Sequence, residues 1–372
     1  MRILHMILSM TGGGAERQLT YIAPELSARG HDVHVAFVVP GVNQDRLAKR
    51  DCTLHHLAAS RKFKPLVFAQ SISLVRRLRP DVLQTWLPHM DIVGGVTARV
   101  LRVPWVISER CAGLLYPPTM LNRLRVAVAR HAGLIVPNSE GGAEYWIGQG
   151  IDAGRLEIVP NYVPLAEIDA AAPLDDERVL VGDELVVHVG RLAPEKNLHS
   201  LIHAFEHVAR LRPRARLAFC GDGPLLPDLM AQAEATGLRE RFIFAGFVNN
   251  VTSWLKRASA VVAVSRSEGH PNAVLEAVVA GVPVIVSDIP AYRSILDEQS
   301  ASFVAGDDEQ AIAAAVVRTL EDRVTAEERA VYARRRLGLP SLEATASRYE
   351  EVYRRAIALA ASGRGRDKAV RV

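Results

Sequence analysis

Two kinds of hydrophobic pattern alternate along this chain. Short, near-continuous runs of Val, Ile and Leu recur, and the apolar residues between them follow the helical repeat. Such runs are typical of parallel strands buried on both faces, so we predict an α/β protein with two doubly wound domains. The predicted strands are RILHMIL, DVHVAFVV, TLHHLA, DVLQTW, PWVIS, GLIVPNS and LEIVPN in the first half, and LVVHVGR, RLAFCGDG, RFIFAGF, AVVAVS, PVIVSD and SFVAG in the second.

An acidic stretch at 163–184 interrupts the alternation and marks the predicted domain boundary. We assign residues 1–164 to the first domain and 180–341 to the second. A long helix predicted over 342–360 is expected to pack back on the first domain. The basic tail that follows, 361–372, is expected to be disordered.

Composition narrows the class of protein. Among the 372 residues, the three cysteines (Cys52, Cys111 and Cys220) lie far apart without metal-ligand spacing. This usage indicates reduced thiols in a cytoplasmic protein. The apolar run after Met1 is short and lacks a cleavage site, so it predicts a buried strand rather than a signal peptide. No apolar run is long enough to cross a bilayer.

Charge is unevenly distributed between the two halves. Residues 1–164 hold 19 Lys and Arg against 12 Asp and Glu, whereas residues 165–372 hold 26 against 29. A basic first half is compatible with a polyanionic or membrane-surface partner, and equally with a solvated face.

Two helical stretches of the first half, 61–80 and 121–132, combine an apolar face with basic residues. The arginines concerned are Arg76, Arg77, Arg79, Arg123, Arg125 and Arg130. We expect peripheral contact with an anionic membrane, on its inner face; the alternative is packing against the sheet with the arginines in water. No nucleic-acid-binding motif accompanies these residues, so a nucleic acid is not an expected partner.

Ligands of open parallel sheets bind at the carboxyl ends of the strands. After the first strand, GGGAERQL places Gly13 and Gly14 at a helix start, where they could approach a phosphate or form only a tight turn. After the first strand of the second half, Gly190 is followed by Arg191 and Lys196. A guanidinium and an ammonium together suit a diphosphate, whereas the alternative is two solvated charges in a loop.

The stretch SRSEGHPNAVLEAVVAGVPVIVSD carries two carboxylates across a turn that opens a helix. Glu268 precedes the helix, Asn272 is a plausible cap, and Glu276 lies about one turn inside. Carboxylates accept hydrogen bonds from sugar hydroxyls, although Glu276 could instead be a buried helix residue. Backbone N–H groups at this helix start can bind sugar or phosphate oxygens, namely those around His270, Asn272 and Ala273.

Five motifs in this order resemble glycosyltransferase family 4: GGGAERQL, VPNYV, GRLAPEKN, GDGPL and SEGHPNAVLEAVVAGVPVIVSD with its Glu-x7-Glu spacing. The resemblance covers nearly the whole chain. It implies the GT-B fold, in which two doubly wound Rossmann-like domains face an interdomain cleft. It also implies a retaining hexosyltransferase that uses a UDP- or GDP-sugar as co-substrate and needs no cofactor. The expected acceptor is a lipid-linked or polysaccharide glycan in cell-surface glycan biosynthesis.

The resemblance assigns roles to residues of the second half. Arg191 and Lys196 would hold the donor diphosphate, Glu268 would contact the donor sugar, and Glu276 would bind the ribose hydroxyls. Gly13 and Gly14, from the first half, would approach the phosphates or the acceptor. The donor-binding residues implied are Gly13, Gly14, Gly190, His270, Asn272, Ala273 and Glu276, beside the catalytic set Arg191, Lys196 and Glu268.

The acceptor side departs from the common family pattern. Many relatives have a histidine after the strand that corresponds to PWVIS, whereas this chain has Ser108, Glu109 and Arg110. Glu109 and Arg110 are therefore candidates for acceptor contacts, together with His89 after the preceding strand. His89 could equally be an ordinary loop histidine.

The resemblance also implies a front-face substitution in which Arg191 and Lys196 offset the charge of the leaving phosphate. No Asp-x-Asp motif stands at a strand end, so no metal is expected. The alternatives of the same form are a nucleotide-sugar epimerase, a phosphorylase and a non-enzymatic sugar-binding protein.

Overall fold

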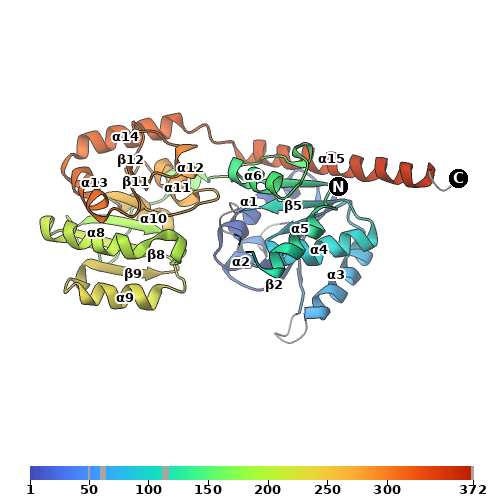
Figure 1. Ribbon diagram of the computed structural model, residues 1–372, viewed down its shortest axis with the longest axis horizontal. Coiled ribbons are helices and arrows are strands. Elements are labelled where there is room, and N and C mark those ends of the chain that lie inside the picture. Colours follow the sequence, from blue (N-terminus) through green and yellow to red (C-terminus); the bar gives the residue numbers. More distant parts are fainter. Residues whose placement is uncertain (49–50, 59–63, 111–115, 117, 370–372) are drawn as a thin grey trace. The chain divides into compact units, whose positions relative to one another are not determined.

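The structure is a computed structural model. It describes residues 1–48, 51–58, 64–110, 116 and 118–369. The chain forms two compact units (Figure 1). The first comprises Met1–Tyr162 and Pro340–Val372, and the second comprises Val163–Leu339.

The first unit is built on a six-stranded parallel sheet in the order β3-β2-β1-β4-β5-β6. Its strands are β1 (Arg2–Ser9), β2 (Asp32–Val39), β3 (Thr53–His56), β4 (Val82–Trp86), β5 (Trp105–Glu109) and β6 (Leu134–Pro137). Its helices are α1 (Gly14–Ala28), α2 (Val42–Ala48), α3 (Lys64–Leu78), α4 (Pro88–Leu101), α5 (Met120–Ala129), α6 (Glu140–Gly148), η2 (Ala153–Arg155) and α15 (Leu342–Ala369).

Burial on both faces explains the continuous apolar strands. In β1, Ile3 and Ile7 pack into one core cluster, with α1 and α15, and Leu4 and Met6 pack into the other. Because successive side chains of a strand point to opposite faces, both sets must be apolar. The first six predicted strands of this half are confirmed.

The seventh predicted strand, LEIVPN, is not a strand. Leu156 makes one isolated parallel bridge with Ile135, and the Glu157 N–H donates to the Ile135 carbonyl at 3.0 Å. The Val159 N–H also donates to the Pro137 carbonyl at 2.9 Å, but Pro137 has no N–H to bond back to this segment, so the ladder beside β6 stays incomplete.

The second unit repeats the architecture with the order β12-β11-β10-β7-β8-β9. Its strands are β7 (Glu184–Val189), β8 (Ala215–Cys220), β9 (Phe242–Gly246), β10 (Ala260–Ala263), β11 (Val284–Ser287) and β12 (Ser302–Val304), which confirms all six predicted strands. Its helices are α7 (Leu165–Ala170), η3 (Pro194–Lys196), α8 (Leu198–Leu211), α9 (Leu226–Ala235), η4 (Arg239–Arg241), α10 (Val251–Arg257), α11 (Asn272–Val279), α12 (Pro290–Arg293), α13 (Glu309–Glu321) and α14 (Arg323–Arg336).

Two segments outside the sheets complete the units. α7 falls in the stretch left out of both predicted domains, and Ile168 packs with Leu275 and Val279 of α11 in the second unit. α15 packs on α1 of the first unit (Figure 1). It continues to Ala369, whereas the predicted disordered tail began at 361, because the stretch contains no proline to stop the helix. Residues 370–372 lie outside the described residues.

Candidate functional site

The strand order of the second unit reverses between β7 and β10, which are hydrogen-bonded neighbours. Ligands of doubly wound sheets bind where the loops after such strands diverge. The loop after β7 carries Lys196, and the loop after β10 carries Glu268. The structure brings these two predicted residues together, with Lys196 Nζ 2.5 Å from Glu268 Oε1. Their side chains remain 17% and 13% exposed, so the pair is open to a ligand.

Glu268 is held from below by two hydroxyl groups. Ser265 Oγ donates to Glu268 Oε1 at 2.7 Å, and the Tyr292 hydroxyl donates to the same oxygen at 3.2 Å. Burial raises the pKa of Tyr292 well above its ordinary value, and the charge of Glu268 acts in the same direction, so the phenol stays protonated. Lys196, Ser265 and Tyr292 all donate to Oε1, and this arrangement orients the carboxylate.

Close packing of the backbone fixes the loops after β7 and β8. Gly221 has φ 154°, and a Cβ at this position would lie 1.9 Å from the Gly190 carbonyl oxygen. The side chain of any other residue would push the two loops apart. Gly221, the first glycine of GDGPL, therefore sets the position of the loop that carries Arg191 and Lys196.

His188 was not found from the sequence, although it lies directly beneath this loop. It is 1% exposed, and its Nδ1 is 3.2 Å from the Val262 carbonyl oxygen, an arrangement that places the proton on Nδ1. Burial lowers the pKa of His188 to about 4, and the charge of Lys196 acts in the same direction. Nε2 is thus a buried acceptor, and it has no hydrogen-bond partner among the residues that the structure describes.

The other predicted donor residues lie around α11. Asn272 is the first residue of the helix rather than its cap, since Pro271 precedes it, and its Oδ1 lies 3.0 Å from His270 Nδ1. His270, Asn272 and Ala273 are half-buried, as a ligand-binding helix start requires. Glu276 lies one turn further and is 6% exposed. Arg191 is exposed at the mouth of β7.

Glu16, which follows the glycine turn of the first unit, is a residue to which the sequence assigned no role. Gly13 is the N-cap of α1, and a Cβ there would lie 2.2 Å from Glu16 Oε2. Glu16 is 5% exposed, its Oε1 accepts from Ser9 Oγ at 2.5 Å, and burial raises its pKa. A buried carboxyl group beside Gly13 and Gly14 favours a hydroxyl ligand over a phosphate.

Glu109 is the predicted acceptor residue that the structure corrects. It is fully buried, and its carboxylate accepts from Arg125 Nη2 at 2.9 Å, Trp146 Nε1 at 3.0 Å and the Tyr116 hydroxyl at 2.6 Å. No exposed surface remains for an acceptor. The signal available in the sequence was weak, because Glu109 is itself a strand residue of β5.

Arg125 also departs from its predicted role at a membrane surface. It is 1% exposed, and its Nε donates to Asp91 Oδ2 at 2.7 Å. Its guanidinium carbon lies 4.6 Å from the ring centroid of Tyr116 and 4.8 Å from that of Trp146. Burial alone would lower the pKa of Arg125, but Glu109 and Asp91 raise it well above its ordinary value. Arg125 is therefore a structural ion within the first unit.

Arg110 and His89 occupy different positions at the same end of the sheet. Arg110 Nη1 donates to Asn161 Oδ1 at 2.8 Å, Arg110 also donates to the Tyr349 hydroxyl, and its guanidinium lies 4.7 Å from the Trp86 ring centroid. Arg110 thus ties β5 to α15. His89 is exposed in the first turn of α4, just after β4. His89 is therefore at the surface, whereas Arg110 is engaged in the fold.

Among the described residues, no group of three or more His, Cys, Asp or Glu side chains could hold a metal ion. No helix within the described part of the chain combines the length and the apolar character needed to cross a membrane.

Comparison with known families divides the chain into two matches. Residues 12–167 match the family described as Glycosyltransferase Family 4, and residues 175–336 match Glycosyl transferases group 1. The glycogen synthase of Mycobacterium tuberculosis is 33% identical over 367 residues, which cover 87% of this chain and 86% of that protein. The N-acetylgalactosamine-N,N'-diacetylbacillosaminyl-diphospho-undecaprenol 4-alpha-N-acetylgalactosaminyltransferase of Campylobacter jejuni is 26% identical over 337 residues, which cover 85% of this chain and 89% of that protein.

Solved structures give the same architecture. Anabaena HepE in complex with UDP-glucose superposes with a TM-score of 0.83 at 19% identity, over 94% of this chain and 98% of that one. Sucrose-phosphate synthase from Thermosynechococcus elongatus superposes with a TM-score of 0.77 at 18% identity, over 96% and 100% of the two chains. These likenesses show the fold.

Proposed function

The chain belongs to glycosyltransferase family 4 and has the GT-B fold, and from this premise we propose that it is a retaining hexosyltransferase. The donor is a UDP- or GDP-sugar, and the acceptor is a lipid-linked or polysaccharide glycan. The observation that carries the proposal is the Lys196–Glu268 pair at the strand-order reversal of the second unit. Relatives named for undecaprenol-linked acceptors and a neighbour crystallised with UDP-glucose support the choice of substrates.

The paired ions divide the work between leaving group and sugar. When a donor diphosphate enters, the ammonium of Lys196 and the guanidinium of Arg191 hold its oxygens. The carboxylate of Glu268, kept in place by Ser265 and Tyr292, then accepts hydrogen bonds from the donor sugar. Glu276 accepts from the ribose hydroxyls, and the N–H groups at the start of α11 contact the remaining oxygens.

The proposed reaction is a substitution on one face of the sugar. The bond between the anomeric carbon and the phosphate oxygen breaks, and the acceptor oxygen bonds to the same face of that carbon. The acceptor proton moves to the departing phosphate oxygen. Arg191 and Lys196 offset the negative charge that develops on the diphosphate, and their stabilisation is therefore greatest in the transition state. No cofactor takes part in this scheme.

A donor panel tests the proposal directly. Purified protein is incubated with UDP-, GDP- and ADP-sugars and a lipid-linked glycan acceptor, and nucleotide release is measured with and without acceptor. We expect acceptor-dependent release, and NMR of the product should show the anomeric configuration of the donor retained. Release without a glycosylated product would contradict transfer, and epimerised donor would point to the epimerase alternative. An inverted product would overturn the retaining mechanism alone.

The ribose contact has its own test. Glu276→Ala should weaken binding of the nucleotide-sugar by about 1.5–3 kcal/mol, because charge-assisted hydrogen bonds to the ribose are lost. Isothermal titration calorimetry measures this change. Glu206→Ala, at a partly exposed position of α8 where the carboxylate pairs with Arg210, serves as the control. Unchanged affinity of the Glu276→Ala variant would remove this residue from the donor site.

We also propose that the first unit contacts the cytoplasmic face of an anionic membrane through α5. Met120 is 80% exposed and Leu124 is 48% exposed, and the exposed residues Arg123 and Arg130 lie on the same segment. Exposed apolar side chains beside cations suit reversible binding to anionic headgroups. The protein should co-sediment with anionic vesicles at low salt and detach as salt rises. Arg123→Gln with Arg130→Gln should weaken sedimentation, and equal partitioning onto neutral vesicles would contradict the proposal.

A further inference from the structure

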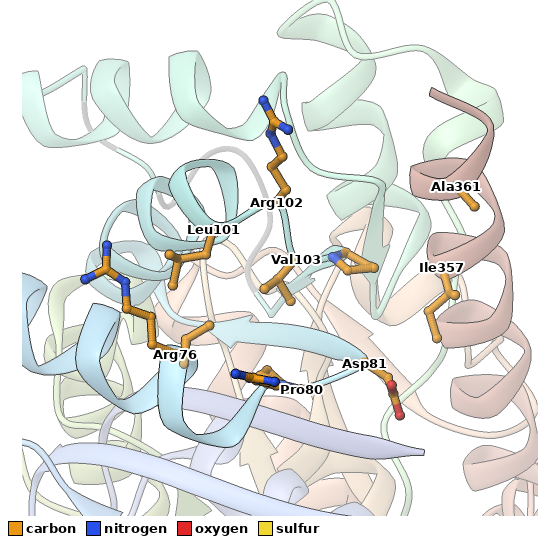
Figure 2. A pocket seen from close by; sticks show the side chains of 11 residues that line it. Arg76, Pro80, Asp81, Leu101, Arg102, Val103, Ile357 and Ala361 are labelled. Atoms are coloured by element: carbon orange, nitrogen blue, oxygen red, sulfur yellow. The ribbon is translucent and has the colours of Figure 1, made fainter. Parts of the chain in front are cut away.

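A groove of about 720 Å³ lies on the first unit at the amino ends of its strands (Figure 2). The loops of the first unit described above lie at the opposite, carboxyl ends of the same strands. It forms where α3 and α4 end and where β4 and β5 begin, and α15 supplies its far side. Figure 2 shows Arg76 and Arg102 along one side, Ile357 and Ala361 along the other, and Val103 between them. The location is remote from the carboxyl-end loops that hold the proposed acceptor residues.

The groove combines cationic and apolar lining. Three of its residues are arginines: Arg76, Arg79 and Arg102. The Arg76 and Arg79 guanidinium groups are exposed and form no ion pair or hydrogen bond with any described residue. The one carboxylate among the described lining residues, Asp81, already accepts from the backbone N–H of Arg2 at 2.7 Å. With three arginines against one carboxylate among its described lining residues, the groove carries net positive charge.

Backbone conformation sets two of these arginines apart. Six described residues that follow the end of an α-helix adopt left-handed φ values between 48° and 86°, and Asn197 does so after the 3-10 helix η3. Four of them are glycines: Gly30, Gly150, Gly237 and Gly281. The other two are Arg79, with φ 48°, and Arg102, with φ 55°. Glycine is the residue that this position favours, because a Cβ is strained there.

The strain points to a use for the side chains. Both arginines that occupy the unfavourable conformation line the same groove, whereas the other four α-helices that end in this conformation carry glycine there. A residue kept in a strained conformation indicates a function that offsets the cost. The carboxyl ends of α3 and α4 carry partial negative charge, so the helices themselves do not attract an anion. Any anion affinity must come from the guanidinium groups.

We propose that this groove binds the phosphate headgroup of an anionic membrane lipid, together with the first carbons of its chain. Arginine forks match phosphate oxygens, and the apolar side formed by Leu101, Val103 and Ile357 accepts the methylene groups. In Figure 2 the side chains of Arg76 and Arg102 extend outward in different directions. The phosphate contacts of the proposal therefore lie at the mouth of the groove. The site extends the membrane contact proposed for α5 but stands on other residues.

Calorimetry with decyl phosphate, kept below its micelle concentration, tests the groove in the full chain. We expect saturable binding, with inorganic phosphate at least about tenfold weaker because it lacks the chain. Arg79→Gly with Arg102→Gly should lower the decyl phosphate affinity at least about tenfold. The same double variant should keep or raise Tm, because glycine relieves the left-handed strain. A merely structural role for these arginines predicts the opposite, a lower Tm.

Further variants separate the possible outcomes. Arg76→Gln should also weaken decyl phosphate binding, and Arg123→Gln with Arg130→Gln should leave it unchanged, since those residues lie outside the groove.

Vesicles of phosphatidylglycerol should compete with decyl phosphate, and vesicles of phosphatidylcholine should not. Equal affinity for inorganic and decyl phosphate, or an unaffected double variant, would overturn the proposal. Loss of sedimentation in the α5 variant with intact decyl phosphate binding would separate the two membrane proposals.

Discussion

Each unit holds a cation beside a carboxylate near the carboxyl ends of its strands, but the two clusters differ in burial. In the first unit, Arg125 is buried between Asp91 and Glu109, which are both fully buried. In the second unit, Lys196 and Glu268 are partly exposed. Aromatic rings cover Arg125 on two sides, whereas the Lys196 ammonium, with three donors, contacts Glu268 alone among the described residues. Removing one partner of a buried ion cluster destabilises the fold, whereas a partly exposed pair remains accessible to a ligand.

Removing the cation from the buried cluster of the first unit should have the largest effect on stability. Arg125→Met leaves Asp91 and Glu109 as buried carboxylates without their counter-ion, so we expect about 3–5 kcal/mol less free energy of unfolding. Urea denaturation measures this difference. Arg123→Met on the exposed face of the same helix should change it by less than about 0.5 kcal/mol. A loss below 1 kcal/mol for Arg125→Met would show that the buried cluster is not structural.

Removing the cation from the partly exposed pair of the second unit should affect turnover instead of stability. For Lys196→Ala we expect kcat to fall by roughly 10²–10³-fold, because leaving-group charge peaks in the transition state. The free energy of unfolding should change by less than about 1 kcal/mol, since the pair is partly solvated. Saturation kinetics with the donor and urea denaturation give the two values. If KM rises while kcat at saturation does not fall, Lys196 binds the donor without assisting departure.

A third cluster lies between the two cases and tests them by pH. Glu350 on α15 accepts from Arg29 Nε at 2.8 Å, and His31 Nε2 lies 3.0 Å from the same oxygen. The hydrogen bond from Arg29 lowers the pKa of Glu350 to about 2. A lowered carboxyl pKa stabilises the fold above its ordinary value near 4.5, and this contribution is lost as pH falls toward 2.

Glu350→Gln should therefore lower the free energy of unfolding by about 1.5–3 kcal/mol at pH 7. Below pH 4.5 the difference between the parent protein and the variant should shrink, as urea denaturation at a series of pH values would measure. Glu351→Gln, an exposed neighbour on the same helix, is the control. A difference that stays constant down to pH 2.5 would contradict the ion-pair origin.

The smallest effect should come from the hydroxyl that orients Glu268. Tyr292→Phe keeps the buried ring but removes its hydrogen bonds to Glu268 and Ser265. We expect about 1 kcal/mol of stability lost and a few-fold decrease in kcat, with KM for the donor nearly unchanged. Steady-state kinetics and thermal denaturation measure both. A variant with parental kcat would show that Ser265 alone suffices to hold the carboxylate.

The fold and the loops of the second unit were accessible from the sequence. Continuous apolar runs identify strands buried on both faces, and glycines with charged residues after those runs identify the loops at the carboxyl ends. These local signals placed Lys196 and Glu268 just after strands, and the structure shows that the two strands are neighbours and that the residues are in contact. Tyr292 carried no such signal, since it reaches Glu268 from the separate helix α12.

Local sequence determined the alternation of strands and helices, and with it two sheets of parallel strands, because strand and helix periodicity are written in neighbouring residues. Only the tertiary structure decided which charges are buried. Arg123 and Arg125 lie two positions apart on α5, yet one is exposed and the other is held by Asp91 from α4 and Glu109 from β5. The environment of a side chain depends on the elements that pack around it, and those partners are distant in the sequence.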